Sequence, residues 1–186
     1  LWIALGSCRL MRLNPASGQR DSFNFAALFG DKTTSVRINS MAEDANGLLW
    51  LGTQLGLVKC TPANGSYNFQ LILADPKNPK GLNNNSIACL LIDPVQSGST
   101  LWIGTKGGGI NRFDIVTNDC QHITTADGLP NNVIYGILPD SKNNLWCSSN
   151  RGLAKISVSQ RTPPLVFDIT AFTVKMGLQD NEFNTF

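Results

Sequence analysis

Residues 128–156 read GLPNNVIYGILPDSKNNLWCSSNRGLAKI and contain every part of a unit that recurs along the chain. The unit consists of a Gly-Leu turn, an apolar strand ending in aspartate, a polar turn, a tryptophan between apolar residues, and a glycine that opens another apolar strand. Short apolar segments separated by Asn, Asp and Gly are typical of antiparallel strands joined by tight turns. A repeated unit of this kind predicts the fold better than any single segment does.

Four tryptophans, spaced 48, 52 and 44 residues apart, mark four copies of the unit: Trp2, Trp50, Trp102 and Trp146. An aspartate at the end of an apolar strand precedes three of them: Asp44, Asp93 and Asp140. A glycine follows the same three: Gly56, Gly109 and Gly152. The first copy has Arg9 at the position of that glycine. A period of about 40 to 50 residues with four short strands is typical of a β-propeller blade, and no stretch sustains the apolar period of a helix.

We therefore predict an all-β chain, a β-propeller fragment of about four blades in which each blade is a four-stranded antiparallel sheet. With the strands of a blade lettered A to D, the last full copy has them near residues 133–138, 144–148, 152–158 and 165–169. The chain as a whole, 1–186, is one partial propeller with these blades: 1–29, which lacks strand A, 35–74, 84–124 and 131–174, with 177–186 starting a further blade. The four tryptophans are expected in the core, and the recurring aspartates are expected to be structural.

Composition agrees with short strands and argues against two classes of partner. Hydrophobic residues make up 42% of the chain and charged residues 15%, with 17 glycines and 9 prolines. The net charge of +2 comes from basic residues spread along the chain, so no nucleic-acid partner is expected. No apolar run approaches the roughly 20 residues of a membrane span, and Leu1–Leu5 lack the features of a signal peptide, so no direct membrane contact is expected within this chain.

The cysteines and the single histidine do not form a metal-binding pattern. Five cysteines include no CxxC pair, and His122 has no second histidine beside it, so neither a metal site nor a cofactor is predicted. An odd number of cysteines cannot pair completely within the chain, and we expect buried apolar thiols instead of a disulfide framework. The triple glycine at 107–109 lacks the Lys and Ser or Thr of a phosphate-binding loop.

The segment LWIGTKGGGINRFD at 101–114 and the stretch at 128–156 resemble the two-component regulator propeller repeat. The final GLQDNEFN, 177–184, is similar to a segment near the end of the periplasmic propellers of Bacteroides-type hybrid histidine kinases. The resemblance implies a periplasmic, ligand-sensing domain of a two-component signalling protein that binds an oligosaccharide and regulates polysaccharide utilisation. It also implies that the membrane span and the kinase domains belong to a longer parent chain.

Propeller topology predicts where the ligand binds. In an antiparallel four-stranded blade, the connections from strand B to C and from strand D to the next strand A lie at the same end. The polar side chains expected to bind ligand at this rim are Gln54, Asn85, Lys106, Asn132, Arg151, Asn181 and Glu182. Their amide and charged groups suit sugar hydroxyls or an acidic substituent. A structural alternative exists for Asn84 and Asn131, which follow Gly-Leu and are expected to bond the backbone of their own turn. For Lys106 and Arg151 both roles stay open.

Three functions compete on the sequence alone: a glycan-sensing module, a propeller enzyme such as a polysaccharide lyase, and a pure protein-interaction scaffold. An enzyme needs an acid–base pair, and the groups available for one are Asp180, Glu182 and His122. Asp44, Asp93 and Asp140 recur with the repeated unit and are expected to be structural. We therefore predict no catalytic residues and no enzymatic activity. The expected partners are an oligosaccharide and either a second copy in a homodimer or the remaining blades of the parent chain. Pairing of 182–186 beside Leu1–Ala4 would instead close a four-bladed ring.

Overall fold

The computed structural model describes residues 1–6, 8–31, 36–162, 164–180 and 182. The described residues form four antiparallel sheets, here called blades 1 to 4 in chain order. Blade 1 contains β1 (Trp2–Leu5), β2 (Arg9–Leu13) and β3 (Arg20–Asn24). Blade 2 contains β4 (Ile38–Glu43), β5 (Leu49–Thr53), β6 (Gly56–Ala63) and β7 (Ser66–Ile72). Blade 3 contains β8 (Ile87–Ile92), β9 (Thr100–Thr105), β10 (Ile110–Asp114) and β11 (Cys120–Ile123). Blade 4 contains β12 (Ile134–Pro139), β13 (Leu145–Ser149), β14 (Gly152–Gln160) and β15 (Val166–Phe172).

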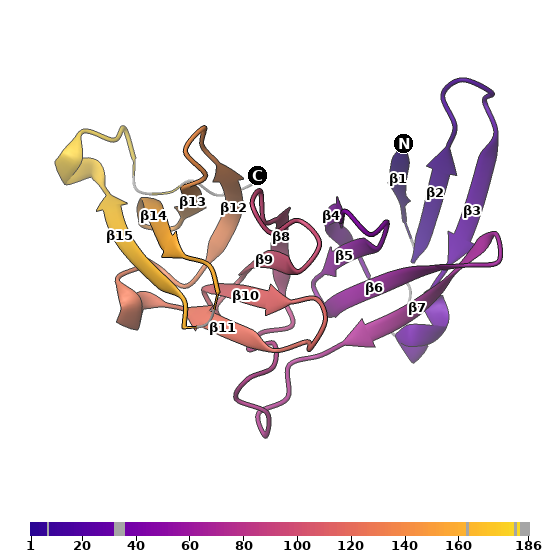
Figure 1. Cartoon of the computed structure of the whole chain (residues 1–186), viewed down its shortest axis with the longest axis horizontal. Coiled ribbons are helices and arrows are strands. Elements are labelled where there is room, and N and C mark those ends of the chain that lie inside the picture. Colours follow the sequence, from indigo (N-terminus) through magenta and orange to yellow (C-terminus); the bar gives the residue numbers. More distant parts are fainter. Residues whose placement is uncertain (7, 32–35, 163, 181, 183–186) are drawn as a thin grey trace.

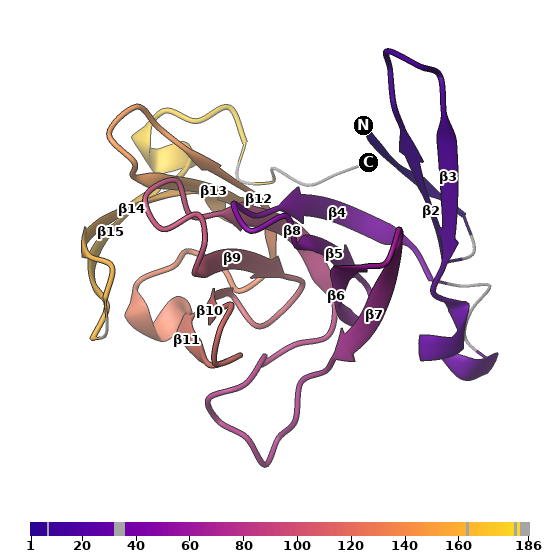
Figure 2. The ribbon, with the colours of Figure 1, turned by 45° about the vertical axis from the view of Figure 1, so that its right-hand side comes forward.

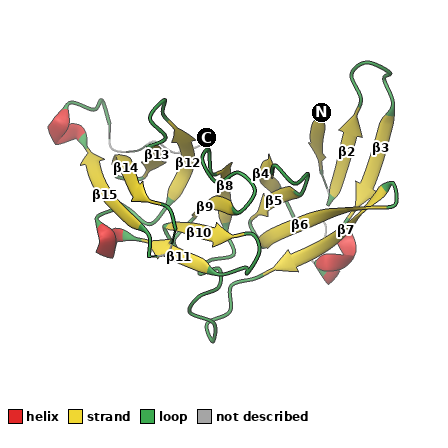
Figure 3. Ribbon diagram, viewed as in Figure 1, coloured by secondary structure: helices red, strands yellow, loops and turns green. Residues whose placement is uncertain are grey.

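The blades follow one another along an open arc, with blade 1 at one end and blade 4 at the other (Figure 1). Within each of the last three blades the strands pair in chain order, from the innermost strand A to the outermost strand D. The all-β class and the propeller architecture predicted from the sequence are confirmed, with three strands described in blade 1 and four in each of the others (Figure 3). Of the segment 177–186, expected to start a further blade, residues 181 and 183–186 lie outside the described residues.

The repeated aspartate and the repeated tryptophan are joined by a hydrogen bond in blades 2 to 4. The indole Nε1 donates to a carboxylate Oδ2 in each blade, at 3.1 Å from Trp50 to Asp44, 2.7 Å from Trp102 to Asp93 and 3.1 Å from Trp146 to Asp140. The second carboxylate oxygen accepts backbone N–H groups of the turn between strands A and B, as Asp44 Oδ1 does from Asn46 and Leu48. One carboxylate therefore closes the hairpin and orients the tryptophan that follows it.

Trp50 and Trp102 are fully buried, and each packs against the following blade. Asp93, beside Trp102, is fully buried as well, and Arg161 of blade 4 pairs with its charge at 3.3 Å. The expectation that all four tryptophans lie in the core is wrong for Trp2 and Trp146, which are half-buried. Trp2 lies on an edge strand, and Trp146 lies on the side of blade 4 that faces away from blade 3, where the described chain has no further sheet.

Backbone geometry explains the repeated glycine after the turn from strand B to strand C. Gly109 and Gly152 have φ angles of +71° and +94°, which L residues rarely adopt. A Cβ atom at Gly152 would also clash with the carbonyl oxygen of Phe172 on the neighbouring strand. Blade 1 lacks this glycine and instead places Cys8 at a φ of +58°.

Four of the cysteines lie in the apolar core as predicted: Cys8, Cys60, Cys120 and Cys147. Burial raises the pKa of the Cys8 thiol, and it raises the pKa of Cys60, Cys120 and Cys147 to about 12. Cys89 is half-buried on strand β8. The described helices are short 3-10 turns, and none has the length and apolar character needed to cross a bilayer.

Trp102→Ala should destabilise the protein by about 3 to 5 kcal/mol, because it removes a fully buried aromatic side chain and leaves Asp93 without its indole partner. Trp146→Ala is the matched control, since the same side chain is only half-buried in blade 4 and its loss should cost less. Urea unfolding followed by circular dichroism measures both. Equal destabilisation by the two changes would contradict the difference in burial.

Asp140 should make stability depend on pH. Hydrogen bonds from Asn144 and then Trp146 hold the pKa of its carboxyl group well below the usual value of about 4. A carboxylate with a lowered pKa stabilises the fold above its unfolded pKa, and this contribution is lost as the pH falls toward the folded pKa.

Asp140→Asn should therefore lower the urea midpoint at about pH 7. Its difference from the wild type should shrink as the pH falls to about 3. Asp168→Asn on strand β15 is an exposed carboxylate control. A deficit of Asp140→Asn that stays constant with pH would contradict this role.

Candidate ligand-binding site

Backbone hydrogen bonds join the loops of blades 3 and 4 at the rim predicted from topology. The backbone N–H of Lys106, in the B–C connection of blade 3, donates to the carbonyl of Ser86 before strand A of the same blade at 2.8 Å. The N–H groups of Gly107 and Gly109 donate to the carbonyl of Asn132, before strand A of blade 4, at 3.1 and 2.8 Å. The B–C connection of blade 3 is thus fastened to the chain on both sides, and the loops of this rim hold one another in place.

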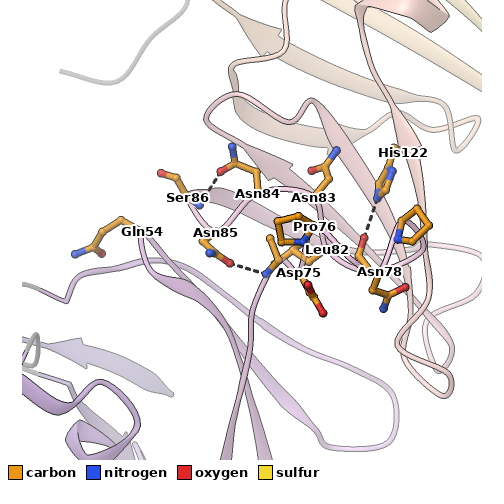
Figure 4. Close-up of a pocket in the computed structure, with 13 residues that line it drawn as sticks. Gln54, Asp75, Pro76, Asn78, Leu82, Asn83, Asn84, Asn85, Ser86 and His122 are labelled. Carbon is orange, nitrogen blue, oxygen red and sulfur yellow. Dashed lines mark hydrogen bonds between the residues drawn. The ribbon is translucent and has the colours of Figure 1, made fainter.

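A cavity of about 640 Å³ opens at this rim between blades 2 and 3 (Figure 4). Most of its wall comes from the long D–A connection, residues 73–86, with Gln54 of blade 2 and His122 of strand β11 completing it. The polar lining consists of Gln54, Asp75, Asn78, Asn83, Asn84, Asn85, Ser86 and His122. Its volume lies within the usual range of small-molecule sites, about 300 to 1,000 Å³.

Asparagine side chains hold the 73–86 connection in shape. Asn85 Oδ1 accepts the backbone N–H of Ala74 at 2.7 Å, which ties the two ends of the connection together. Asn84 Oδ1 accepts the N–H of Ser86 at 2.8 Å. Asn83 and Asn111 of strand β10 bond each other twice, at 3.1 and 2.9 Å. The connection is consequently ordered before any ligand arrives.

The same connection covers the outer edge of blade 3. His122 Nε2 lies 2.9 Å from the carbonyl of Gly81, and the backbone N–H of Cys120 donates to the carbonyl of Lys80. A carbonyl oxygen can only accept, so Nε2 is the donor in this contact. An edge strand that would otherwise expose its backbone is thereby paired, and a histidine is held at the wall of the cavity.

The lining supports recognition of a ligand rich in hydroxyl groups. The turn bonds use the amide oxygens of Asn84 and Asn85, and their NH₂ groups have no hydrogen bond among the described residues. The hydroxyl of Ser86 and the carboxylate of Asp75, which can accept hydrogen bonds, line the same cavity. Within the part of the chain that the structure describes, no three His, Cys, Asp or Glu side chains gather into a group that could hold a metal ion.

The structure separates the seven sequence-predicted ligand residues. Gln54 and Asn85 share the cavity, although their amide oxygens bond the backbone of Arg37 and Ala74. Lys106 lies in a smaller hollow of about 130 Å³ with Asn39, Ala88 and Tyr135, its ammonium 5.9 Å from the centre of the tyrosine ring. Arg151 lies in a third hollow, with Thr173, Val174 and Lys175.

Asn132 and Glu182 lie outside all three hollows. Asn132 Oδ1 accepts the N–H of Thr125 at 2.9 Å and so bonds within its own connection. Glu182 is exposed, and Asn181 lies outside the described residues. The structural alternative for Asn84 and Asn131 is confirmed, because their side chains accept the N–H groups of Ser86 and Val133 at 2.8 and 2.7 Å.

Sequence reasoning missed Asp75, Asn83 and Tyr135. Asp75 and Asn83 belong to the 73–86 connection, which is four residues longer than the corresponding 124–133 connection after blade 3, and that extra length was the available signal. Strand A of blade 4 has Tyr135 at the position where blades 2 and 3 have Asn39 and Ala88. This difference between the copies pointed to the inner rim.

Comparison with known proteins agrees with the repeat. Residues 33–54 and 128–151 match the family model of the two component regulator propeller. These two segments are thus similar to two-component regulator propeller repeats. These segments include the strand-A aspartates and the tryptophans of blades 2 and 4, whose hydrogen bonds are described above.

Solved structures share the fold. The extracellular domain of a hybrid two component system from B. thetaiotaomicron superposes with a TM-score of 0.70 at 22% identity, over 97% of this chain and 22% of that chain. Virginiamycin B lyase from Staphylococcus aureus superposes with a TM-score of 0.57 at 14% identity, over 89% of this chain and 49% of that chain. At such identities the likeness shows a common propeller fold.

One curated relative is similar in sequence along most of the chain. Histidine kinase P4 of Formosa agariphila is 29% identical over 84% of this chain and 14% of its own length. The chain therefore spans about one seventh of that kinase and 22% of the extracellular domain from B. thetaiotaomicron.

Asn85→Ala should loosen the 73–86 connection without unfolding the blades, because it removes the bond to Ala74. The amide of Ala74 should exchange with solvent about tenfold faster, as expected for the loss of one hydrogen bond worth about 1 to 1.5 kcal/mol. Hydrogen–deuterium exchange measures this, with Lys77→Ala at an exposed position of the same connection as the control. Unchanged exchange at Ala74 would contradict the role given to Asn85.

Proposed function

We propose that the chain is a ligand-sensing, extracytoplasmic domain of a two-component signalling protein, and that it binds an oligosaccharide in the cavity between blades 2 and 3. The observation that carries the proposal is the preordered wall of asparagines around that cavity. Fixed amide donors beside hydroxyl and carboxylate acceptors suit the alternating donors and acceptors of sugar hydroxyls. Occupancy of the cavity is the input, and regulation of polysaccharide utilisation by the parent protein is the output.

Two observations support the sensor role over an enzyme. Two segments of the chain are similar to two-component regulator propeller repeats, and the aspartates of the repeat are used by the fold, as hydrogen-bond partners of tryptophans and turns. The lyase alternative has only the shared propeller fold in its support. A periplasmic location is part of the proposal, supported by the solved relative from B. thetaiotaomicron, which is an extracellular domain.

Isothermal titration calorimetry tests the proposal with defined probes: the tetrasaccharides of cellulose, xylan, mannan and alginate. At least one should bind, and His122→Phe should weaken it about tenfold by removing a polar group from the cavity wall. Arg151→Ala, which changes a different hollow, should leave the affinity unchanged.

Two outcomes would contradict the proposed site. Binding that survives His122→Phe but is lost with Lys106→Ala or Arg151→Ala would move the site to one of the smaller hollows. Conversion of a probe into unsaturated products would replace the sensor with a lyase.

A further inference from the structure

Strand β10 of blade 3 buries an arginine whose hydrogen-bonding groups are only partly paired. Arg112 is 5% exposed, and its Nη2 donates to Gln96 Oε1 and Thr100 Oγ1 at 3.0 and 3.1 Å. Its Nε is buried and has no hydrogen-bond partner among the described residues. Gln121 lies opposite on strand β11, and its Oε1 is likewise buried and unpaired in that part of the chain. Buried polar atoms are nearly always paired, so this donor and this acceptor indicate a binding site.

The position of this arginine differs between the blades. Next to the repeated tryptophan, the cross-strand row continues outward with Lys59 and Gln70 in blade 2, and with Lys155 and Thr170 in blade 4. Both lysines are half-buried, and Gln70 is exposed. Arg112, at the same position of blade 3, is buried. The unpaired donor and acceptor are therefore a feature of blade 3 and not of the repeat.

A hollow of about 430 Å³ opens beside Arg112 and Gln121, at the outer edge of blade 3. Strands β10 and β11 and the turn between them form most of it, and Lys80 of the 73–86 connection completes it. The hollow shares no lining residue with the cavity between blades 2 and 3. Blade 3 lies between blades 2 and 4 of the arc (Figure 2), so the hollow is not at an end of the described chain.

Hydrogen bonds within the chain hold the rim of the hollow in place. Asp114 Oδ1 accepts two backbone N–H groups of the turn that follows it, both at 2.9 Å. The backbone N–H of Asp114 donates to the carbonyl of Asp119 at 2.8 Å and closes that turn. Lys80 donates its backbone N–H to Asn78 Oδ1 at 3.2 Å, and its carbonyl accepts from strand β11. The rim is consequently ordered before a ligand binds.

The groups around the hollow favour a neutral ligand with hydroxyl groups. The positive charges of Arg112 and Lys80 are balanced by the negative charges of Asp114 and Asp119. An anion would meet two carboxylates as well as the amide oxygen of Gln121. A hydroxyl group suits the buried pair, because its oxygen can accept from Arg112 Nε while its proton is donated to Gln121 Oε1. Neighbouring hydroxyl groups of the same ligand can then bond the carboxylates and the ammonium of the rim.

We propose that blade 3 carries a second binding site, in which Arg112 and Gln121 together hold one hydroxyl group of a small, neutral, polyhydroxylated ligand. The volume of the hollow lies in the usual range of small-molecule sites. The shared chemistry of acyclic polyols and monosaccharides defines the ligand class. This inference does not rest on the proposed function, because no residue lining the first cavity takes part.

NMR spectroscopy of the isotopically labelled 186-residue chain tests the proposal, because Arg112 Nε–H and the Gln121 side-chain amide each give a resonance of their own. The probes are sorbitol, glucose and xylose. Titration up to about 100 mM covers the millimolar affinity expected of a few hydrogen bonds. At least one probe should shift both resonances along a saturable curve. A response to sorbitol alone identifies an acyclic polyol, and a response to glucose or xylose alone identifies a monosaccharide.

Two matched variants and one charged probe complete the test. Gln121→Leu removes the acceptor and should weaken binding at least about tenfold, as read from the Arg112 Nε–H resonance. Gln70→Leu makes the same change at the equivalent, exposed position of blade 2 and should leave the affinity unchanged. Glucuronate, which adds a carboxylate to glucose, should bind no more tightly than glucose does. Circular dichroism confirms that each variant is folded.

Four outcomes would overturn the proposal. They are the absence of a saturable shift with every probe, a shift that survives Gln121→Leu, equal weakening by Gln121→Leu and Gln70→Leu, and tighter binding of glucuronate than of glucose. The first of these is read from the wild-type chain alone and needs no variant. None of the measurements uses the tetrasaccharide titration, so failure here leaves the proposed function to its own test.

Discussion

The hydrogen bond from the indole to the aspartate supports the whole architecture. A tryptophan that fills the space between two blades must bury a polar N–H, and a carboxylate that is buried must have donors around it. Asp93 meets both needs, since it accepts from Trp102, from the turn between strands A and B, and from Arg161 of the next blade. Hairpin closure, tryptophan orientation and the contact between blades therefore depend on the same few atoms, which explains why they recur together.

The loops use asparagine in a similar double role. In the 73–86 connection, the side-chain oxygens of Asn84 and Asn85 each accept a backbone N–H of the connection, and this leaves their amino groups at the wall of the cavity. A rigid scaffold with loops of different length then produces hollows of different shape at each blade. The cavity between blades 2 and 3 is formed where the connection is long enough to cover the edge of strand β11.

The sequence predicted part of the geometry of the rim, whereas ligand binding by the predicted residues stays a prediction. The topology of antiparallel strands was enough to bring Gln54 and Asn85 to one rim, because alternate connections must lie at the same end of a blade. Topology does not set the distance around the arc, so Lys106 and Arg151 lie in separate hollows. Composition also does not show which amide atoms already make hydrogen bonds. The side-chain oxygen of Asn132, for example, accepts the backbone N–H of Thr125 within its own connection.

The amino-acid sequence by itself determined the repeat, the strands within it and the structural role of Asp44, Asp93 and Asp140, because spacing and residue type are local properties that recur in every copy. Only the tertiary structure decided which tryptophans are buried. Burial depends on whether a neighbouring sheet covers a face, and this is why Trp102 is enclosed while Trp146, with the same local sequence, remains half-buried at the end of the arc. The cavity was likewise decided by packing, since its wall combines residues from two blades.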